Sequence, residues 1–145
     1  MMIRTVLAVT ALALGVSAAT AQDPIAARKA LMKTNGQQAA QGAKFMKGEE
    51  PFNLAKAQAI FASYQDAAAK MPNLFPANSK TGGETTAAPA LWDKMDDVKA
   101  RFAKLGADAK DTAAKVKDEA SFKAAFPEIQ KNCGGCHEPY RIKKS

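Results

Sequence analysis

Both cysteines and the only histidine of the chain lie within five residues near its carboxyl end. They read Cys133-Gly134-Gly135-Cys136-His137, a C-x-x-C-H motif. On a helix, positions i, i+3 and i+4 share one face, so two thiols and an imidazole can face the same flat group. This pattern is typical of covalent haem attachment, with a thioether from each cysteine and the histidine as proximal iron ligand. The two glycines leave the backbone open where a macrocycle must approach closely.

Three other uses of the motif compete with haem attachment. A thiol redox pair typically opens a helix after a strand, whereas this motif follows a run of helix-forming residues. A disulfide between residues three apart suits an oxidising compartment but gives His137 no role. A zinc site would need a fourth ligand. Covalent haem is therefore favoured, and a haem-free thiol oxidoreductase stays as an alternative.

Length and composition restrict the function classes further. With 145 residues and a mass of 15.3 kDa, the chain is long enough for one domain. One histidine excludes a bis-histidine haem made within one chain, and two cysteines exclude a Cys₄ zinc site. Basic residues exceed acidic ones by seven but alternate with them along the chain, which argues against nucleic-acid binding. No nucleotide loop or hydrolytic triad is present, so the chain is not expected to be an enzyme.

The first 21 residues are typical of a secretory signal peptide. Arg4 is their only charge, an apolar run begins at Val6, and Ala19-Thr20-Ala21 is a small-x-small cleavage pattern. A retained anchor needs about 20 apolar residues, and this stretch becomes more polar before that. Cleavage predicts a mature domain of residues 22–145 in the periplasm, with no membrane anchor. Haem of the c type is attached after export, so the two predictions agree.

The mature chain is rich in helix formers and poor in β-branched residues. Asp23 followed by Pro24 predicts the start of a first helix, and Gly48 predicts its end. Its inward face recurs every seven residues at Ile25, Met32, Ala39 and Met46. Asn53 predicts the cap of a second helix that ends at Pro72. The apolar face of that helix comprises Ala57, Ile60, Phe61, Tyr64, Ala68 and Met71.

A long connection is predicted at 72–88, before the second half of the chain. Pro89 then predicts the start of a third helix. This helix is expected to run to about position 117, with Gly106 as a weak point. Its apolar face comprises Leu91, Met95, Val98, Phe102, Leu105 and Ala109. Ser121 predicts the start of a fourth helix, in which Pro127 should cause a kink or a restart. The apolar face of the fourth comprises Phe122, Phe126, Ile129, Cys133 and Tyr140. Four helices with one long connection predict an antiparallel bundle.

With the haem motif in its last helix, the chain resembles the class II cytochromes c, which include cytochrome c′ and the low-spin cytochrome c-556 type. Class I cytochromes c carry the motif near the amino terminus instead. The resemblance covers essentially the whole mature chain and rests on four stretches: RKALMKTNG, KGEEPF, PALWDKMDDVKARF and SFKAAFPEIQKNCGGCHEPYR. It implies an all-α, antiparallel, left-handed four-helix bundle with one covalently bound haem c at one end of the bundle.

The resemblance also implies roles for single residues. Cys133 and Cys136 match the attachment sites, and His137 matches the proximal iron ligand. Arg28 matches a first-helix arginine near a haem propionate, with an exposed surface arginine as the alternative. Arg141 matches a basic residue one turn past the ligand. The chain departs from the family pattern at two prolines, Pro127 inside the last helix and Pro139, which suggests an early end to that helix.

The sixth iron ligand decides between two functions. Because there is no second histidine, a strong-field ligand must come from methionine, lysine or the backbone. The mature methionines are Met32, Met46, Met71 and Met95. The resemblance implies that Met32, one turn after Arg28, covers the distal side, and low-spin relatives ligate iron through a methionine there. We predict that Met32 is the distal ligand of a periplasmic electron carrier. The alternative is a five-coordinate, high-spin haem that binds nitric oxide or carbon monoxide, with Met32 only packed over the iron.

The predicted partners are periplasmic redox proteins, and the oligomer is a monomer or a homodimer. Basic residues near the motif could form a rim around the haem edge that attracts an acidic partner, or they could be a solvated tail. They are Lys131, Arg141, Lys143 and Lys144. Trp92 and Phe102 are predicted core residues that can touch the porphyrin.

Overall fold

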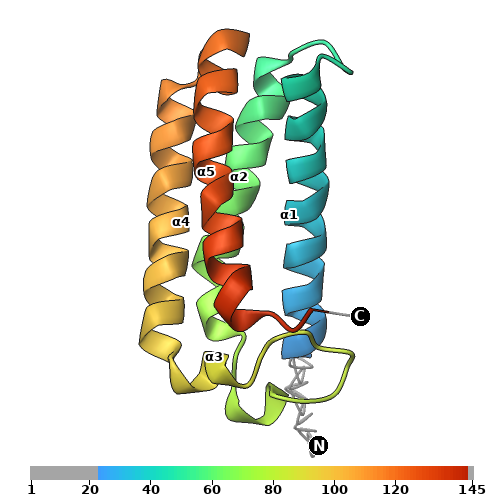
Figure 1. Cartoon of the computed structure of the whole chain (residues 1–145), viewed down its shortest axis with the longest axis vertical. Coiled ribbons are helices and arrows are strands. Elements are labelled where there is room, and N and C mark those ends of the chain that lie inside the picture. The colour runs from blue at the N-terminus through green and yellow to red at the C-terminus, as the bar shows by residue number, and fades with distance from the viewer. Residues whose placement is uncertain (1–22, 144–145) are drawn as a thin grey trace, which may run out of the picture.

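The computed structural model describes residues 23–143, and the predicted signal peptide lies outside this range. Its four long helices are α1 (Pro24–Lys47), α2 (Leu54–Lys70), α4 (Met95–Lys115) and α5 (Glu119–Tyr140). In Figure 1, α1 and α4 run upward and α2 and α5 run downward. Helix α1 packs on α2 and α5, and α4 packs on the same two. The predicted antiparallel four-helix bundle is thereby confirmed.

Local sequence sets the helix ends in the first half of the chain. The Asp23 carboxylate accepts a hydrogen bond from the backbone N–H of Ile25, and the Asn53 side chain accepts one from that of Lys56. Gly48 ends α1 in the left-handed conformation, with φ of 71°, which a residue without Cβ adopts freely. The caps predicted at these positions are confirmed.

The third predicted helix is in fact two. A short helix, α3 (Ala90–Asp93), is separated from α4 by Lys94, whose backbone leaves the helical region at φ −127° and ψ 36°. Leu91 of α3 is buried at the end of the bundle. The break at Lys94 changes the direction of the chain between α3 and α4. Gly106 does not interrupt α4. A Cβ there would lie 3.2 Å from the Cβ of Ala68, so its small size suits close packing of α4 on α2.

The restart of the last helix that Pro127 could cause does not occur. Helix α5 runs unbroken through Pro127 and ends at Tyr140, one residue past Pro139. Pro127 is exposed, so the Lys123 carbonyl that it leaves without an N–H partner faces a side of the helix that water can reach. The helix also begins earlier than predicted, because Asp118 is its cap and Ser121 completes a capping box three residues later.

The long connection closes the lower end of the bundle in Figure 1. It contains two single-turn helices, η1 (Met71–Asn73) and η2 (Ala77–Ser79). Its last residues are tied to the end of α5: the Ala88 N–H donates to the Tyr140 carbonyl at 2.9 Å, and the Ile142 N–H donates to the Thr86 carbonyl at 2.8 Å. The connection therefore lies against the segment that carries the haem motif.

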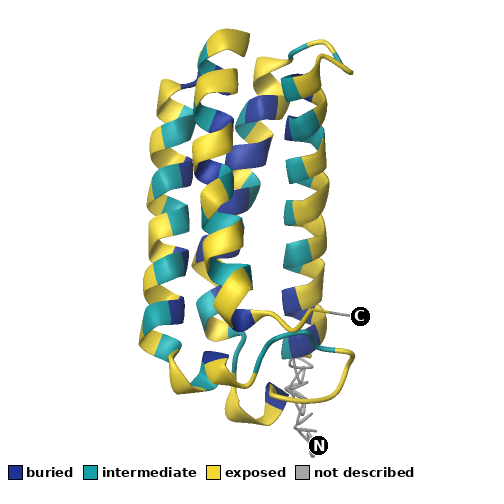
Figure 2. Ribbon diagram, in the orientation of Figure 1, coloured by how far each residue is buried: buried dark blue, intermediate teal, exposed yellow. Residues whose placement is uncertain are grey.

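The buried residues face inward along all four long helices (Figure 2), and most of the apolar ones form two clusters. The first, called the distant core, comprises Phe45, Ala57, Ile60, Phe61, Tyr64, Ala109, Val116, Phe122, Phe126 and Ile129. The second, called the site core, comprises Ala67, Met71, Leu91, Val98, Phe102 and Tyr140. No helix among residues 23–143 is long and apolar enough to cross a bilayer.

The seven-residue seam predicted for α1 holds only at its start. Ile25 is buried, but Ala39 and Met46 are half-buried, and the buried positions in the second half are Gly42 and Phe45. A straight helix drifts by about 20° per heptad, which shifts the inward face over three heptads. Gly42 is buried because α5 comes very close: a Cβ built on it would lie 2.2 Å from Cζ of Phe126.

Candidate functional site

The C-x-x-C-H motif lies in the last two turns of α5, as predicted. Cys133, Cys136 and His137 are all half-buried on the helix. Cys136 packs against the site core. The Cys133 thiol donates to Oε1 of Gln130 over 3.6 Å, and both cysteines are free. All three side chains are therefore partly exposed on α5, and Cys136 contacts the apolar interior.

The electrostatics of this face separate haem attachment from thiol redox chemistry. Burial raises the pKa of both the Cys133 and the Cys136 thiols, whereas a redox C-x-x-C pair needs a lowered thiol pKa. Burial, and next the charge of Arg141, lowers the pKa of His137. The imidazole is thus neutral near pH 7, which is the form that binds a metal ion.

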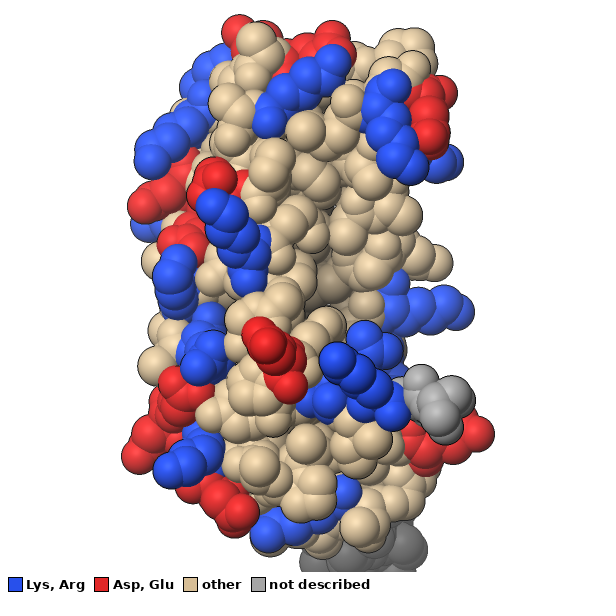
Figure 3. Space-filling view, viewed as in Figure 1, with Lys and Arg blue, Asp and Glu red and all other residues tan. Residues whose placement is uncertain are grey.

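The residues around the motif fit a haem. Gly134 is exposed, and a Cβ built on it would meet no other part of the protein within 4 Å, so one side of the motif is open to solvent. Leu31 and Met32 of α1 pack against the same site core as Cys136. Between α1 and α5 the surface is hollowed about halfway along the bundle (Figure 3). The imidazole and two thiols of α5, together with the Met32 thioether at the cluster that Cys136 contacts, are a donor set for a covalently attached iron porphyrin.

A zinc site finds no comparable support. In the described part of the chain, no group of three or more His, Cys, Asp or Glu side chains is placed to hold a metal ion. The motif supplies two thiols and one imidazole, and within residues 23–143 no Asp or Glu side chain joins them as a further ligand.

Met46, the second first-helix methionine, lies at the other end of the interior. It packs against the distant core, while Met32, Met71 and Met95 belong to the site core or pack against it. The tertiary structure therefore reduces the four candidate methionines to three.

Arg28 is buried, with 5 % of its surface exposed, so the alternative of an exposed arginine was wrong. Its Nη1 donates to the Leu74 carbonyl and, at 2.8 Å, to the Ser79 hydroxyl, and its Nη2 donates to the Ser79 carbonyl at 3.0 Å. The guanidinium also lies 4.8 Å from the ring centre of Phe75. Arg28 therefore holds the long connection against α1, which sequence alone did not indicate.

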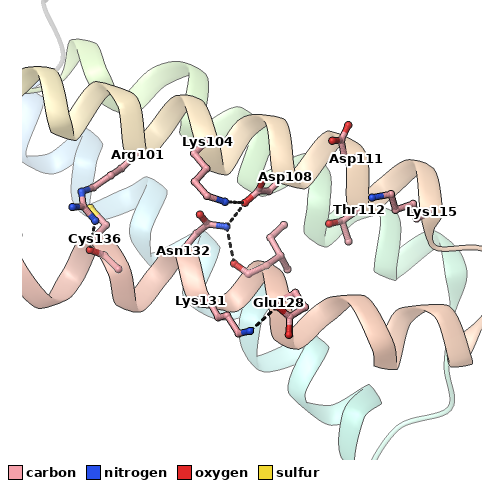
Figure 4. A pocket seen from close by; sticks show the side chains of 12 residues that line it. Arg101, Lys104, Asp108, Asp111, Thr112, Lys115, Glu128, Lys131, Asn132 and Cys136 are labelled. Carbon is pink, nitrogen blue, oxygen red and sulfur yellow. Dashed lines mark hydrogen bonds and ion pairs between the residues drawn. The ribbon is translucent and has the colours of Figure 1, made fainter.

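The three predicted rim residues that lie within 23–143 do not form one rim. Lys131 lies in a groove between α4 and α5 and pairs with Glu128 at 2.6 Å (Figure 4). Arg141 is ten residues further on, about 15 Å along a helix, and it directly follows the last residue of α5. Arg141 and Lys143 are exposed there, and Lys144 lies outside the described residues. In that groove lysines alternate with carboxylates, so no basic surface results.

The predicted aromatic core residues are in place. Phe102 is buried in the site core, and Trp92 is half-buried against it. The indole N–H of Trp92 donates to the Phe75 carbonyl at 3.0 Å, which ties α3 to the long connection.

Two polar contacts beside the motif were missed by sequence reasoning. On α4, Nε of Arg101 donates to Asp97 at 2.6 Å, and its Nη1 donates to the Gly135 carbonyl at 2.7 Å. The hydroxyl of Tyr140 donates to the same Asp97 carboxylate at 2.5 Å. The i, i+4 spacing of Asp97 and Arg101 indicated the ion pair, but nothing local indicated its contact with α5.

The second missed contact involves a buried phenol. Tyr64 accepts a hydrogen bond from Gln130 at 2.8 Å, and burial raises the pKa of Tyr64 to about 12. Because Gln130 also accepts from the Cys133 thiol, it links α2 to the first cysteine of the motif.

An all-helical bundle with C-x-x-C-H on its last helix, and with an apolar cluster against which Cys136 packs, defines a c-type haem protein of the bundle class. A sequence model of the family described as Cytochrome C′ matches residues 23–141. The chain belongs to this family, and it carries covalently bound haem c.

Its relatives include both branches that the sequence resembles. It is 45 % identical over 136 residues to a cytochrome c′ of Rhodopseudomonas palustris, with 91 % of each chain covered. It is 39 % identical to a cytochrome c-556 of Agrobacterium fabrum, covering 81 % of this chain and 80 % of the relative.

Solved structures divide in the same way. The fold matches cytochrome c′ from Rhodopseudomonas palustris with a TM-score of 0.83 and 42 % identity, covering 86 % of this chain and all of the other. It matches the oxidised cytochrome c556 of that organism with a TM-score of 0.79 and 29 % identity, again covering 86 % of this chain and all of the other. Members of the family carry electrons or bind small ligands at haem, and they are not typical enzymes.

Proposed function

We propose that the chain is a low-spin electron carrier of the periplasm. Thioethers from Cys133 and Cys136 hold the haem, His137 is the proximal ligand of its iron, and Met32 is the distal ligand. When bound, haem supplies reversible one-electron chemistry between Fe(III) and Fe(II). A thioether as sixth ligand raises the reduction potential and occupies the position that a gas molecule would need.

The observation that carries the proposal is the position of Met32. It lies on α1 and packs against the same apolar cluster as Cys136 on α5. Met32 is half-buried, so its side chain is not enclosed by the packed interior. The chain has one histidine, which is already assigned, so methionine is the strong-field side chain that this cluster offers.

The test is an absorption spectrum of oxidised and reduced protein, with and without carbon monoxide. Wild type should be low-spin and should not react with carbon monoxide, and Met32→Leu should become high-spin and bind it. Met46→Leu is the matched control, because Met46 packs in the distant core, and its spectrum should not change. Met71→Leu and Met95→Leu test the other two methionines of the site core.

The second candidate is a five-coordinate, high-spin haem that binds nitric oxide or carbon monoxide. The 45 % identity to a cytochrome c′ favours it. A wild-type spectrum that is high-spin at neutral pH, and unaltered by Met32→Leu, would reject Met32 ligation and establish this second function.

Arg28 remains the candidate partner of a haem propionate. It is buried at the end of the bundle that holds the motif, and a guanidinium is suited to bind a carboxylate. Its bonds to the long connection fix its position before haem arrives.

Export and docking complete the proposal. The mature chain should be recovered from the periplasm with Gln22 as its first residue, which amino-terminal sequencing checks. The exposed Arg141 and Lys143 at the end of α5 would attract an acidic redox partner. Electron transfer to such a partner should then slow as salt rises, because exposed charges are screened within about 10 Å at 0.1 M salt. Sedimentation distinguishes the monomer from the homodimer.

A further inference from the structure

Pro139 removes one hydrogen bond from the turn of α5 that carries His137. In an α-helix the carbonyl of residue i accepts from the N–H of residue i+4, so the Gly135 carbonyl would accept from residue 139. Proline has no N–H. The carbonyl in the middle of the haem motif therefore lacks its helical donor.

Arg101 of α4 supplies the missing donor. Its Nη1 donates to the Gly135 carbonyl at 2.7 Å, and its side chain points at the motif beside Cys136 (Figure 4). The hydrogen bond lost at Pro127 is not replaced in this way. The carbonyl that Pro127 leaves without a helical donor belongs to Lys123, which is exposed on the outer side of α5. Of the two prolines inside α5, only the one beside the haem motif has its lost bond replaced by a side chain from another helix.

The same guanidinium is held at two further points. Its Nε donates to the Asp97 carboxylate at 2.6 Å, and the guanidinium carbon lies 5.6 Å from the ring centre of Tyr140. The Tyr140 hydroxyl donates to Asp97 at 2.5 Å, which closes a ring of contacts between α4 and the last turn of α5. A planar fork of donors suits this arrangement, since one nitrogen faces the carboxylate while another faces the carbonyl.

We propose that Arg101 is a positioning residue for the proximal ligand: it replaces the Pro139 hydrogen bond at Gly135 and so fixes the turn that presents His137 to the iron. Arg101 acts through the backbone of the motif and through Asp97 and Tyr140. The role concerns the proximal side, so it does not depend on whether Met32 or no residue is the sixth ligand.

The test is a double-mutant cycle on the holoprotein with Arg101→Ala and Pro139→Ala. The first readout is amide hydrogen exchange in the last turn of α5, including the Arg141 amide that donates to the His137 carbonyl. Arg101→Ala should speed this exchange by about 2- to 10-fold, the equivalent of one lost hydrogen bond. Pro139→Ala restores an N–H to the Gly135 carbonyl, so adding Arg101→Ala to it should change the exchange little.

The second readout reports the ligand itself. A looser turn gives a wider spread of imidazole orientations, so the electron paramagnetic resonance lines of ferric haem should broaden in Arg101→Ala and narrow again in the double variant. Loss of bundle stability without loss of positioning would leave the line widths unchanged. Lys99→Ala is the matched control, because Lys99 is an exposed basic residue of the same helix.

Arg101→Lys serves if Arg101→Ala yields no holoprotein, because lysine keeps the charge but has one nitrogen for two acceptors. Faster exchange in Arg101→Lys that Pro139→Ala suppresses supports the proposal. The proposal is overturned if replacing Arg101 speeds amide exchange equally with and without Pro139→Ala. It is also overturned if replacing Arg101 does not speed amide exchange at all.

Discussion

Close packing of α1 on α5 at Gly42 makes a sharp prediction for Gly42→Ala. The new methyl group would lie 2.2, 2.4 and 2.9 Å from three atoms of the Phe126 ring, whereas ordinary contact begins near 3.4 Å. Phe126 is 5 % exposed and stacks on Phe122 with ring centres 4.9 Å apart, so neighbouring side chains restrict the movement of the ring. The helices must therefore separate by about 1 Å.

Two effects of opposite sign decide how much Gly42→Ala changes the free energy of unfolding. Overpacking of a filled core costs about 1–3 kcal/mol, and three atoms in conflict indicate the upper part of that range. Replacing a helical glycine with alanine returns about 1 kcal/mol. Gly42→Ala should therefore lower the free energy of unfolding by about 1–2 kcal/mol, since the overpacking cost exceeds the helix-propensity gain.

Gly36→Ala is the matched control on the same helix. A Cβ at Gly36 meets nothing within 4 Å, so only the propensity gain remains and the variant should be stabilised by about 0.5–1 kcal/mol. Guanidinium denaturation of both holoproteins, followed by far-UV circular dichroism, measures the difference. Equal stability of the two variants would refute the close approach of Phe126. Shortening the ring in Gly42→Ala/Phe126→Leu should recover part of the loss.

Arg28→Lys should cost at least about 2 kcal/mol, because carbonyls of the long connection lose their donors, and limited proteolysis should then cut that connection faster than in wild type. Asp118→Asn should make the free energy of unfolding fall less steeply as the pH is lowered. Hydrogen bonds from Ser121 hold the pKa of Asp118 below its usual value. The ionised carboxylate therefore stabilises the fold above that usual value, and this stabilisation is lost below about pH 4. A loss below pH 4 as large as that of wild type would contradict this, as measured by denaturation from pH 7 downward. Cys133→Ala should keep one thioether, so acid–acetone should still extract no haem, but the melting temperature of the holoprotein should fall. Removing both cysteines should let acid–acetone extract all the haem. Free thiols at both positions in mass spectra of the wild type would refute the attachment.

Short-range patterns in the sequence predicted the features that depend on a few neighbouring residues. The caps at Asp23 and Asn53 and the left-handed end at Gly48 each involve contacts within four or five positions. The haem motif is equally local, because one helical turn brings its three side chains to one face. The apolar faces of α2 and α5 follow from the same helical period.

Predictions from neighbouring residues failed for features that depend on which side of a helix faces water or another helix. Pro127 does not break α5 because it lies on the exposed side. The seam of α1 moves from a heptad spacing to Gly42 and Phe45 because α5 is packed against it there. Neither fact can be calculated from the residues within one turn.

What the sequence by itself determined is the presence of four helices and of a haem-binding face on the last one, since periodicity and caps are properties of contiguous residues. Only the tertiary structure decided which methionines share a cluster with the motif, why Arg28 is buried and which residue serves the Gly135 carbonyl. These contacts join helices that are distant along the chain. Their formation depends on how the helices pack, so no spacing within one helix could reveal that Arg101 bonds to the motif.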